Sequence, residues 1–248
     1  MKILLRPLQI LYSIYALLLF VLIMLLLFPF VLLASLFGNV RGGNIIYRIC
    51  MLWGDIWFPL VGIFHKNIYE QPLDKSKSYI YVANHISYLD AAIIVKTFRK
   101  PLRPLGKAEF AKVPVFGYIY KNVIVSVDRS NPHNRARSVQ RLKAFLKKGI
   151  SVLVFPEGTF NTTCMPLKDF YDGAFRIAIE TGTPIKPVLF LDTHDRLHYD
   201  SIFSLTPGKS RSLFLEEISV AGLTLKDIPQ LKEKVHRIMS GKLSEPGL

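Results

Sequence analysis

A histidine and a carboxylate lie five positions apart in the first half of the chain. His85 follows a short apolar run, Tyr79 to Ala83, that predicts a buried strand, and Asp90 lies where a helical pattern begins. Histidine can take a proton from a hydroxyl near neutral pH, and a carboxylate can fix its tautomer and stabilise the imidazolium. A strand-to-helix turn lets two such side chains point back toward each other. The pair therefore predicts base chemistry on a hydroxyl.

The same stretch has a second interpretation, because Ser87 and Asp90 form a Ser-x-x-Asp pattern at a helix start. In a capping box such a carboxylate accepts a backbone N–H and does no chemistry. Spacing alone leaves both interpretations open.

A Pro-Glu-Gly turn, Pro156 to Gly158, follows a second predicted strand, residues 152–154. It brings backbone N–H groups and the Glu157 carboxylate to the end of a strand, where open α/β sheets bind their ligands. An ordinary tight turn has the same composition. This turn alone therefore does not decide between binding and structure.

Half of the 248 residues are hydrophobic, and the formal net charge is +14. The first 41 residues contain three basic residues and no acidic one, so most of the positive charge lies further along the chain. Such an excess favours anionic partners, and anionic membrane lipid fits best beside an apolar N-terminus. Nucleic acid is not expected, since no reader motif occurs. The two cysteines, Cys50 and Cys164, are too few for a disulfide framework and favour a reducing, cytoplasmic-side domain.

Residues 7–40 contain no Asp, Glu, Lys or Arg. One straight helix of this length would measure about 50 Å, against about 30 Å for a hydrocarbon core. We therefore expect strong tilt or a break, with Pro29 and Gly38 as candidate positions. A second apolar segment, 45–64, contains Asp55 and two tryptophans and is expected to lie in the interface or to pair with the first. Residues 1–65 are thus predicted to be a membrane anchor of one or two helices, spanning or re-entrant.

Residues 66–78 are polar and predict a linker into a catalytic domain, 66–248. Strand and helix patterns then alternate, which predicts an α/β fold with a central, mostly parallel sheet flanked by helices. The predicted strands are 78–83, 102–106, 123–127, 151–155, 184–191 and 212–218, and the predicted helices are 88–98, 108–120 with an interruption at Pro114, 132–148, 172–181 and 224–240.

Taken together, two motifs resemble the glycerolipid acyltransferase family, whose best-known members are the lysophosphatidic acid (1-acylglycerol-3-phosphate) acyltransferases. They are Asn84-His85-x-x-x-x-Asp90 and Phe155-Pro156-Glu157-Gly158-Thr159. The resemblance extends over roughly residues 78–190. Its further matches are Lys107-x-Glu109 with Pro114-x-Phe116-Gly117, then Val125 to Arg129, and Pro184 to Val188, which includes Pro187.

The resemblance implies that His85 is the general base on the acceptor hydroxyl and that Asp90 orients it. The hydroxyl would attack the thioester of acyl-CoA or acyl carrier protein directly, with no bound cofactor and no metal. Further residues would hold the phosphate and polar head of a lysophospholipid, most of all Arg129, whose guanidinium donates in a fork. The other members of this predicted binding set are Lys107, Glu157, Gly158 and Thr159.

One departure from the family pattern bears on the acceptor. The third motif often continues with arginine, whereas Phe160 follows Thr159 here. We therefore expect transfer to 1-acylglycerol 3-phosphate, giving phosphatidic acid, and keep a lysophospholipid with a larger head, or a lyso-aminolipid, as the alternative. A non-catalytic lipid-binding protein is a further alternative, which the intact His85 and Asp90 disfavour.

Two other patterns predict less. His194 and His198 have the spacing of a zinc-binding helix, but Asp195 stands where such motifs have glutamate, so a polar loop is expected instead. The basic helix 132–148 contains no acidic residue, and its cations are interpreted as a solvated face or as a contact with anionic lipid or CoA phosphates.

Overall fold

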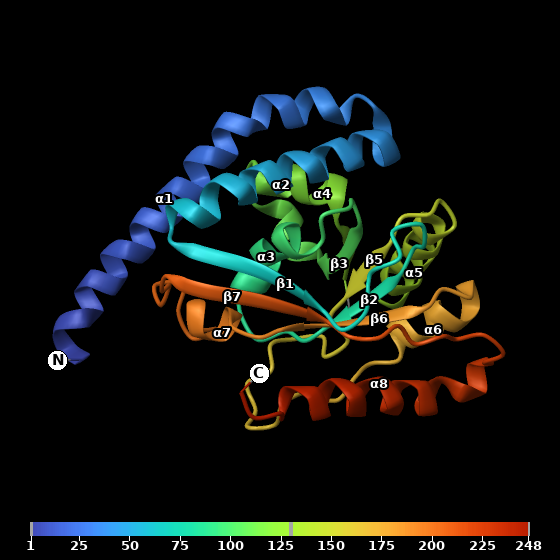
Figure 1. The fold of residues 1–248 in the computed structure, drawn as a ribbon. Helices are drawn as coiled ribbons and strands as arrows, with labels where there is room; N and C mark the ends of the chain where they lie inside the picture. The colour runs from blue at the N-terminus through green and yellow to red at the C-terminus, as the bar shows by residue number, and fades with distance from the viewer. Residues whose placement is uncertain (1, 129–130, 248) are drawn as a thin grey trace. The chain divides into compact units, whose positions relative to one another are not determined.

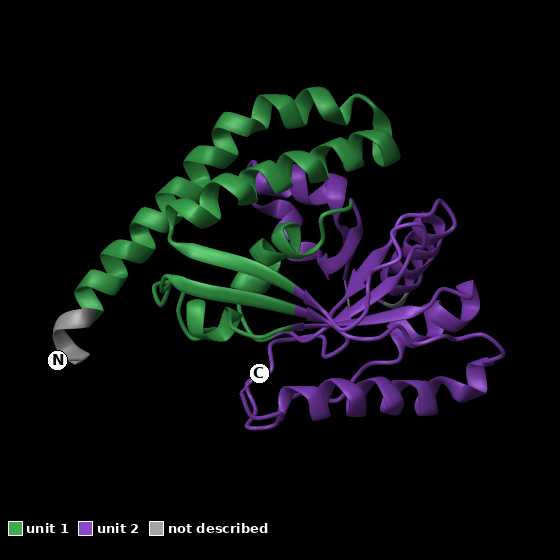
Figure 2. Cartoon of the chain, in the orientation of Figure 1, with its two compact units in different colours: residues 1–67, 86–100, 190–212 green, residues 68–85, 101–189, 213–248 purple. Residues whose placement is uncertain are grey.

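The computed structural model of the protein describes residues 2–128 and 131–247, with side chains described from residue 6 onward except at residue 132. Helices and strands alternate along most of the chain (Figure 1). The chain forms two compact units (Figure 2). Unit 1 contains residues 1–67, 86–100 and 190–212, and unit 2 contains residues 68–85, 101–189 and 213–248. The predicted boundary between an anchor, 1–65, and a catalytic domain, 66–248, remains a prediction.

The N-terminal part of unit 1 is a pair of helices. α1 (Lys2–Ser35) continues through Pro29, so the predicted break at that residue is wrong. The break comes instead at Gly38, whose φ of 77° is favoured by glycine. A short π-helical turn, η1 (Gly38–Gly42), then leads into α2 (Gly43–Leu60). A Cβ atom on Gly42 would lie 2.5 Å from the Ala34 carbonyl oxygen, so the close approach of this turn to α1 requires glycine.

α2 runs back along α1, as Figure 1 shows. The Trp57 indole N–H donates to the Ala16 carbonyl at 2.8 Å, and that of Trp53 donates to the Phe20 carbonyl at 3.3 Å. These pairs fix an antiparallel register, and the Phe20 and Trp53 rings meet edge to face at 4.4 Å. The second apolar segment therefore pairs with the first, one of the two arrangements predicted for it.

The rest of unit 1 contains α3 (Leu89–Thr97), α7 (Thr193–Arg196) and most of two strands, β1 (Ile63–Tyr69) and β7 (Gly208–Phe214). Asp55 on α2 forms ion pairs with Lys96 and Arg99, each at 2.7 Å, which tie α2 to α3. β1 occupies the start of the predicted linker, 66–78, so that prediction is wrong for residues 66–69. The short α7 takes the place of the expected loop around His194.

The strands of the described chain form one sheet in the order β1-β7-β6-β2-β5-β3-β4. The last five of these strands pair in parallel, with Ile80 opposite Val152 on one side and Ile185 on the other. Every residue of β2 and β5 is buried, as expected for strands covered on both faces. Their bounds are β6 (Ile185–Phe190), β2 (Ile80–Ala83), β5 (Val152–Val154), β3 (Arg103–Lys107) and β4 (Val125–Val127).

Helices cover the parallel strands of unit 2. α5 (Pro132–Leu146) packs on β3, β4 and β5, and α6 (Gly173–Thr181) packs on β2 and on α8 (Ile228–Leu243). The remaining helices are η2 (Ala108–Lys112), α4 (Phe116–Val123) and η3 (Leu225–Asp227). The predicted α/β fold with a mostly parallel sheet is confirmed. The last predicted strand, 212–218, is shifted: β7 ends at Phe214, and Ile218 keeps only an isolated bridge to Ile185.

Candidate active site

The parallel register brings the sequence motifs of unit 2 to one edge of the sheet. Val82 lies opposite Val154, so the residues that follow β2 and β5, His85 and Glu157 among them, leave the sheet on the same side. Lys107, the last residue of β3, lies opposite Val127, the last residue of β4. This is the carboxyl edge, where parallel sheets carry their sites.

The backbone of His85 is held on both sides. Its N–H donates to Glu157 Oε1 at 2.8 Å, and its carbonyl accepts the N–H of Asn161 at 2.7 Å. The loops after β2 and β5 are therefore joined through His85 itself. Because both main-chain groups are bonded, the Cα–Cβ direction of the histidine is fixed by the fold.

Glu157 is a buried carboxylate that binds backbone. Its side chain belongs to a residue only 2% exposed, and its second oxygen accepts the Lys168 N–H at 2.9 Å. The turn that carries it closes with the Gly158 N–H donating to the Phe155 carbonyl at 3.1 Å, and Gly158 has a φ of 79°. A carboxylate that accepts two N–H groups gives strong, charge-assisted bonds, so Glu157 positions the loop that carries His85.

Two aromatic rings pack on the His85 imidazole. Phe155 stacks on it at 4.3 Å with an interplanar angle of 19°, and Phe160 meets it edge to face at 4.4 Å and 65°. Sequence reasoning quoted both phenylalanines but assigned neither to the histidine. The signal was present, because Phe155 directly precedes, and Phe160 directly follows, the Pro-Glu-Gly-Thr stretch.

In unit 1, the Asp90 carboxylate is fully buried and binds the start of α3. Its Oδ2 accepts the N–H of Ile86 at 2.7 Å and that of Ser87 at 2.9 Å, and Ser87 Oγ accepts the Leu89 N–H. Asp90 thus binds backbone N–H groups as the capping interpretation expects. Both backbone bonds use Oδ2 of Asp90. The predicted role of Asp90 in orienting His85, which belongs to unit 2, remains a prediction.

The remaining predicted residues lie in unit 2. Lys107 and Thr159 are exposed, and Thr159 Oγ1 accepts a bond from Lys168 Nζ at 2.8 Å. Asn84 is buried beside His85, Pro156 accepts the Tyr171 N–H through its carbonyl, and Pro187 lies within β6 opposite Val82. Arg129 lies outside the described residues.

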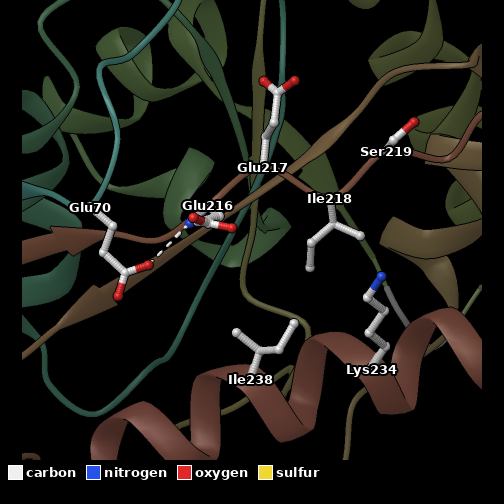
Figure 3. Close-up of a pocket in the computed structure, with 7 residues that line it drawn as sticks. All are labelled: Glu70, Glu216, Glu217, Ile218, Ser219, Lys234 and Ile238. Carbon is white, nitrogen blue, oxygen red and sulfur yellow. Dashed lines mark hydrogen bonds between the residues drawn. The ribbon is translucent and has the colours of Figure 1, made fainter.

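A separate pocket of about 390 Å³ opens in unit 2 beside α8 (Figure 3). Ile218, in its lining, pairs with the first residue of β6, so the pocket lies toward the amino end of that strand, away from His85. Two of its carboxylates have cationic partners: Glu70 pairs with Lys242 at 3.3 Å, and Glu217 with Lys77 at 2.9 Å. The lining residues are Glu70, Glu216, Glu217, Ile218, Ser219, Lys234 and Ile238.

Unit 1 contains a second titratable group that is buried in a polar network. His65 on β1 contacts Asn67 Oδ1 at 2.8 Å and Ser210 Oγ at 3.2 Å. The Asn67 amide donates to the Thr97 carbonyl at 2.9 Å. Burial lowers the pKa of His65 to about 4, so the ring is neutral at physiological pH. Within residues 2–128 and 131–247, His, Cys, Asp and Glu form no group of three or more that could hold a metal.

The sheet is mostly parallel, and a histidine with both backbone groups hydrogen-bonded lies at its carboxyl edge. This arrangement is typical of α/β proteins that act on a ligand bound at that edge. The fold agrees with a solved structure, that of the 1-acyl-sn-glycerophosphate acyltransferase PlsC from Thermotoga maritima. The two match with a TM-score of 0.73 at 23% identity, over 98% of this chain and 96% of that one.

The family follows from sequence. Residues 65–191, just over half of the chain, match the acyltransferase family, and the chain belongs to it. The predicted family and enzyme class, an O-acyltransferase, are confirmed.

Curated relatives extend the comparison. A 1-acyl-sn-glycerol-3-phosphate acyltransferase of Haemophilus influenzae is 26% identical over 84% of this chain and 85% of its own length. An enzyme of the same name from Cocos nucifera is 35% identical over 46% of this chain and 38% of its own length. An uncharacterised acyltransferase of Schizosaccharomyces pombe is 29% identical over 71% of this chain, which spans 64% of that protein.

Proposed function

We propose that this protein transfers a fatty acyl chain from a thioester to the free hydroxyl of a lysophospholipid. His85 removes the hydroxyl proton as the oxygen attacks the thioester carbonyl. The carbon–sulfur bond then breaks, and the proton passes from His85 to the departing thiolate, so an ester and a thiol leave. Asp90 fixes the tautomer of His85 and stabilises the imidazolium between these steps.

The observation that carries this proposal is the fixed backbone of His85 at the carboxyl edge of the sheet. Its N–H donates to Glu157 and its carbonyl accepts from Asn161. These bonds fix the backbone from which the imidazole ring extends, at the edge of the sheet where ligands bind. A merely structural histidine does not need a buried carboxylate to hold its main chain. A non-catalytic lipid-binding protein, the remaining alternative, would not require this pair of residues.

We propose 1-acylglycerol 3-phosphate as the acceptor, with phosphatidic acid as the product. The relatives named above from Haemophilus and Cocos have names that specify this reaction. Lys107 and Arg129 would bind the phosphate, with Gly158 and Thr159 near the polar head. The donor would be acyl-CoA or acyl carrier protein, with no bound cofactor.

A second acceptor is favoured by one observation. Phe160 lies against the His85 ring, at the position where an arginine for the phosphate was expected. An apolar ring cannot pair with a phosphate, so a lysophospholipid with a larger head, or a lyso-aminolipid, is the alternative acceptor.

We further propose that the chain is membrane-attached, with the predicted catalytic domain, 66–248, on the cytoplasmic side and anionic lipid headgroups as partners. α1 contains a 30-residue segment, Arg6–Ser35, that is long and apolar enough to cross a bilayer. The apolar pair of α1 and α2 would keep the site where lysolipid is dissolved.

The test is transfer of labelled acyl chains from acyl-CoA to a panel of lysolipids by the full-length protein and by its His85→Ala variant. We expect transfer to 1-acylglycerol 3-phosphate by the natural sequence and a loss of at least about 100-fold in the variant. Near-normal turnover by the variant would remove His85 from the mechanism. Acylation of another lysolipid alone would select the second acceptor.

A further inference from the structure

Apolar side chains are exposed along a short segment of unit 2, residues 107–121, which contains η2 and most of α4. Phe110 is 46% exposed, Val113 is 44% exposed and Tyr118 is 39% exposed, and Pro114 between them is also exposed. Single exposed apolar residues are normal, but a group within nine positions marks an interaction site.

A strained turn holds this segment in shape. Val115 has φ 61° and ψ −61°, and the Phe116 N–H donates to the Pro114 carbonyl at 2.6 Å. These angles and this bond define the rare γ-turn with positive φ. Val115 is the one non-glycine residue with positive φ in the described chain, and a β-branched residue is strained in this conformation. Such strain persists only where the surrounding structure holds the conformation, and it clusters at functional sites.

The segment is also closely packed on its inner side, so its exposed side chains stand on a rigid support. A Cβ atom on Gly117 would lie 2.5 Å from the Ala111 carbonyl oxygen, which holds η2 against the first turn of α4. Tyr120 is buried, and its hydroxyl donates to the Lys107 carbonyl at 2.8 Å.

Lysines flank the apolar group. Lys112 and Lys121 are exposed, and in the described chain neither has an ion pair. Lys107 and Glu109 are the other charged residues of the segment, which therefore keeps a positive balance. Apolar and aromatic tips with lysines beside them are the composition of elements that lie in a membrane interface, where the tips enter the acyl boundary and the lysines meet anionic headgroups.

We propose that residues 107–121 are a bilayer-contacting surface of unit 2, separate from α1 and α2, in which Phe110 and Val113 enter the interface of an anionic leaflet and Lys112 and Lys121 bind its headgroups. The partner is lipid rather than protein for two reasons. The exposed group is a short segment with exposed lysines beside it, and α1 of the same chain is apolar enough to hold the protein at a bilayer. The inference does not depend on the reaction proposed above.

The test places a fluorescent label on the segment in the full-length protein. In a Cys50→Ala/Cys164→Ser background, Val113→Cys is labelled with an environment-sensitive dye, and the protein is reconstituted into phosphatidylcholine vesicles with and without phosphatidylglycerol. We expect a blue-shifted emission that lipids carrying a shallow nitroxide quench. Leu225→Cys is the matched control, because Leu225, on η3 of the same unit, is 46% exposed, close to the 44% of Val113.

The lysines give a second readout. Lys112→Gln should lower the ratio of inserted to free label about fivefold in vesicles with phosphatidylglycerol and leave it unchanged in phosphatidylcholine alone, since a lysine near an anionic surface contributes about 1 kcal/mol. Lys226→Gln, beside the control position, should change neither.

Three results would overturn the proposal. The labels at 113 and 225 could be equally quenched by aqueous iodide and untouched by nitroxide lipid. The label at 113 could be shielded from both quenchers, which means that protein covers it. Lys112→Gln could have no more effect than Lys226→Gln. Because insertion needs no turnover, His85→Ala should insert as the natural sequence does, and loss of transfer without loss of insertion would separate the two proposals.

Discussion

At the residue scale, the backbone position of His85 is determined by the carboxylate of Glu157. Glu157 binds the His85 N–H with one oxygen and the Lys168 N–H with the other. The sequence suggested that Glu157 helps to hold the acceptor head, and the structure shows it bonded to backbone. The two roles make different kinetic predictions.

Glu157→Ala should lower kcat far more than it raises KM for the lysolipid. Loss of both backbone acceptors frees the loop that orients His85, and a misplacement of about 1 Å can reduce the rate about 100-fold. Steady-state kinetics with varied acceptor would measure this, with Glu233→Ala, an exposed glutamate on α8, as the control. A rise in KM with kcat unchanged would instead support contact with the acceptor.

His65 predicts how stability depends on pH. Its folded pKa, about 4, lies below the unfolded value of about 6.5, so the unfolded chain takes up a proton first as pH falls. The neutral His65 ring makes its full contribution to the free energy of unfolding above about pH 6.5. This contribution is lost as the pH falls toward 4, by at most about 1.4 kcal/mol per pH unit.

His65→Gln should therefore lower the thermal unfolding temperature at about pH 7 and flatten its dependence on pH between about 7 and 5. Thermal unfolding of the full-length protein in detergent at several pH values would measure this. His133→Gln, an exposed histidine on α5, should leave the dependence unchanged. A pH profile that is the same for His65→Gln and the natural sequence would show that other groups produce it.

At the element scale, the γ-turn before α4 reverses the usual effect of glycine. Glycine normally destabilises a chain by about 0.5–1 kcal/mol, but at Val115 it removes strain of about 1–3 kcal/mol. Val115→Gly should thus unfold at the same or a higher temperature than the natural sequence, whereas Val113→Gly, two positions earlier, should unfold at a lower one. Thermal unfolding would compare the two, and a clear loss of stability in Val115→Gly would show that the valine side chain outweighs its backbone strain.

Local sequence patterns predicted the elements that local forces form. β2, β5 and β6 are buried apolar runs, and α5 begins at Asn131 and Pro132 as capping preferences require, so all four were found within two or three residues of their ends. His85 and the turn that contains Glu157 were also located by sequence, because they follow such runs directly.

Elements that depend on distant contacts were not predicted. β1 contains Lys66 and Asn67, whose polarity suggested a linker. It is a strand because β7 pairs with it and because the hydroxyls of Ser210 and Thr97 contact the polar ring of His65. Pro29 lies inside α1, which continues beyond it to Ser35. The aromatic contacts of His85 likewise join residues about 70 positions apart.

At the scale of the whole molecule, a net charge of +14 accompanies a long apolar helix. Binding through charge is screened by salt and lost when lysines are neutralised, whereas burial of α1 in hydrocarbon is not. The two contributions can therefore be separated by the wash conditions.

The protein should stay with membranes through alkaline carbonate extraction, because α1 and α2 would be inserted rather than adsorbed. Sedimentation of membranes after a carbonate wash and after a high-salt wash would measure this, with a known peripheral protein as the control. Complete release into the carbonate supernatant would contradict an inserted N-terminus.

The contacts of α1 also concern the order in which the chain is made. Gln9 donates to the Ser204 carbonyl, 195 residues later, and Ser13 accepts the Leu205 N–H, 192 residues later. At about 5–20 residues per second, a ribosome needs roughly 10–40 s to produce those partners after α1 has been synthesised. During that interval the first turns of the nascent helix lack these partners, so targeting to a membrane during translation would protect their apolar surface from aggregation.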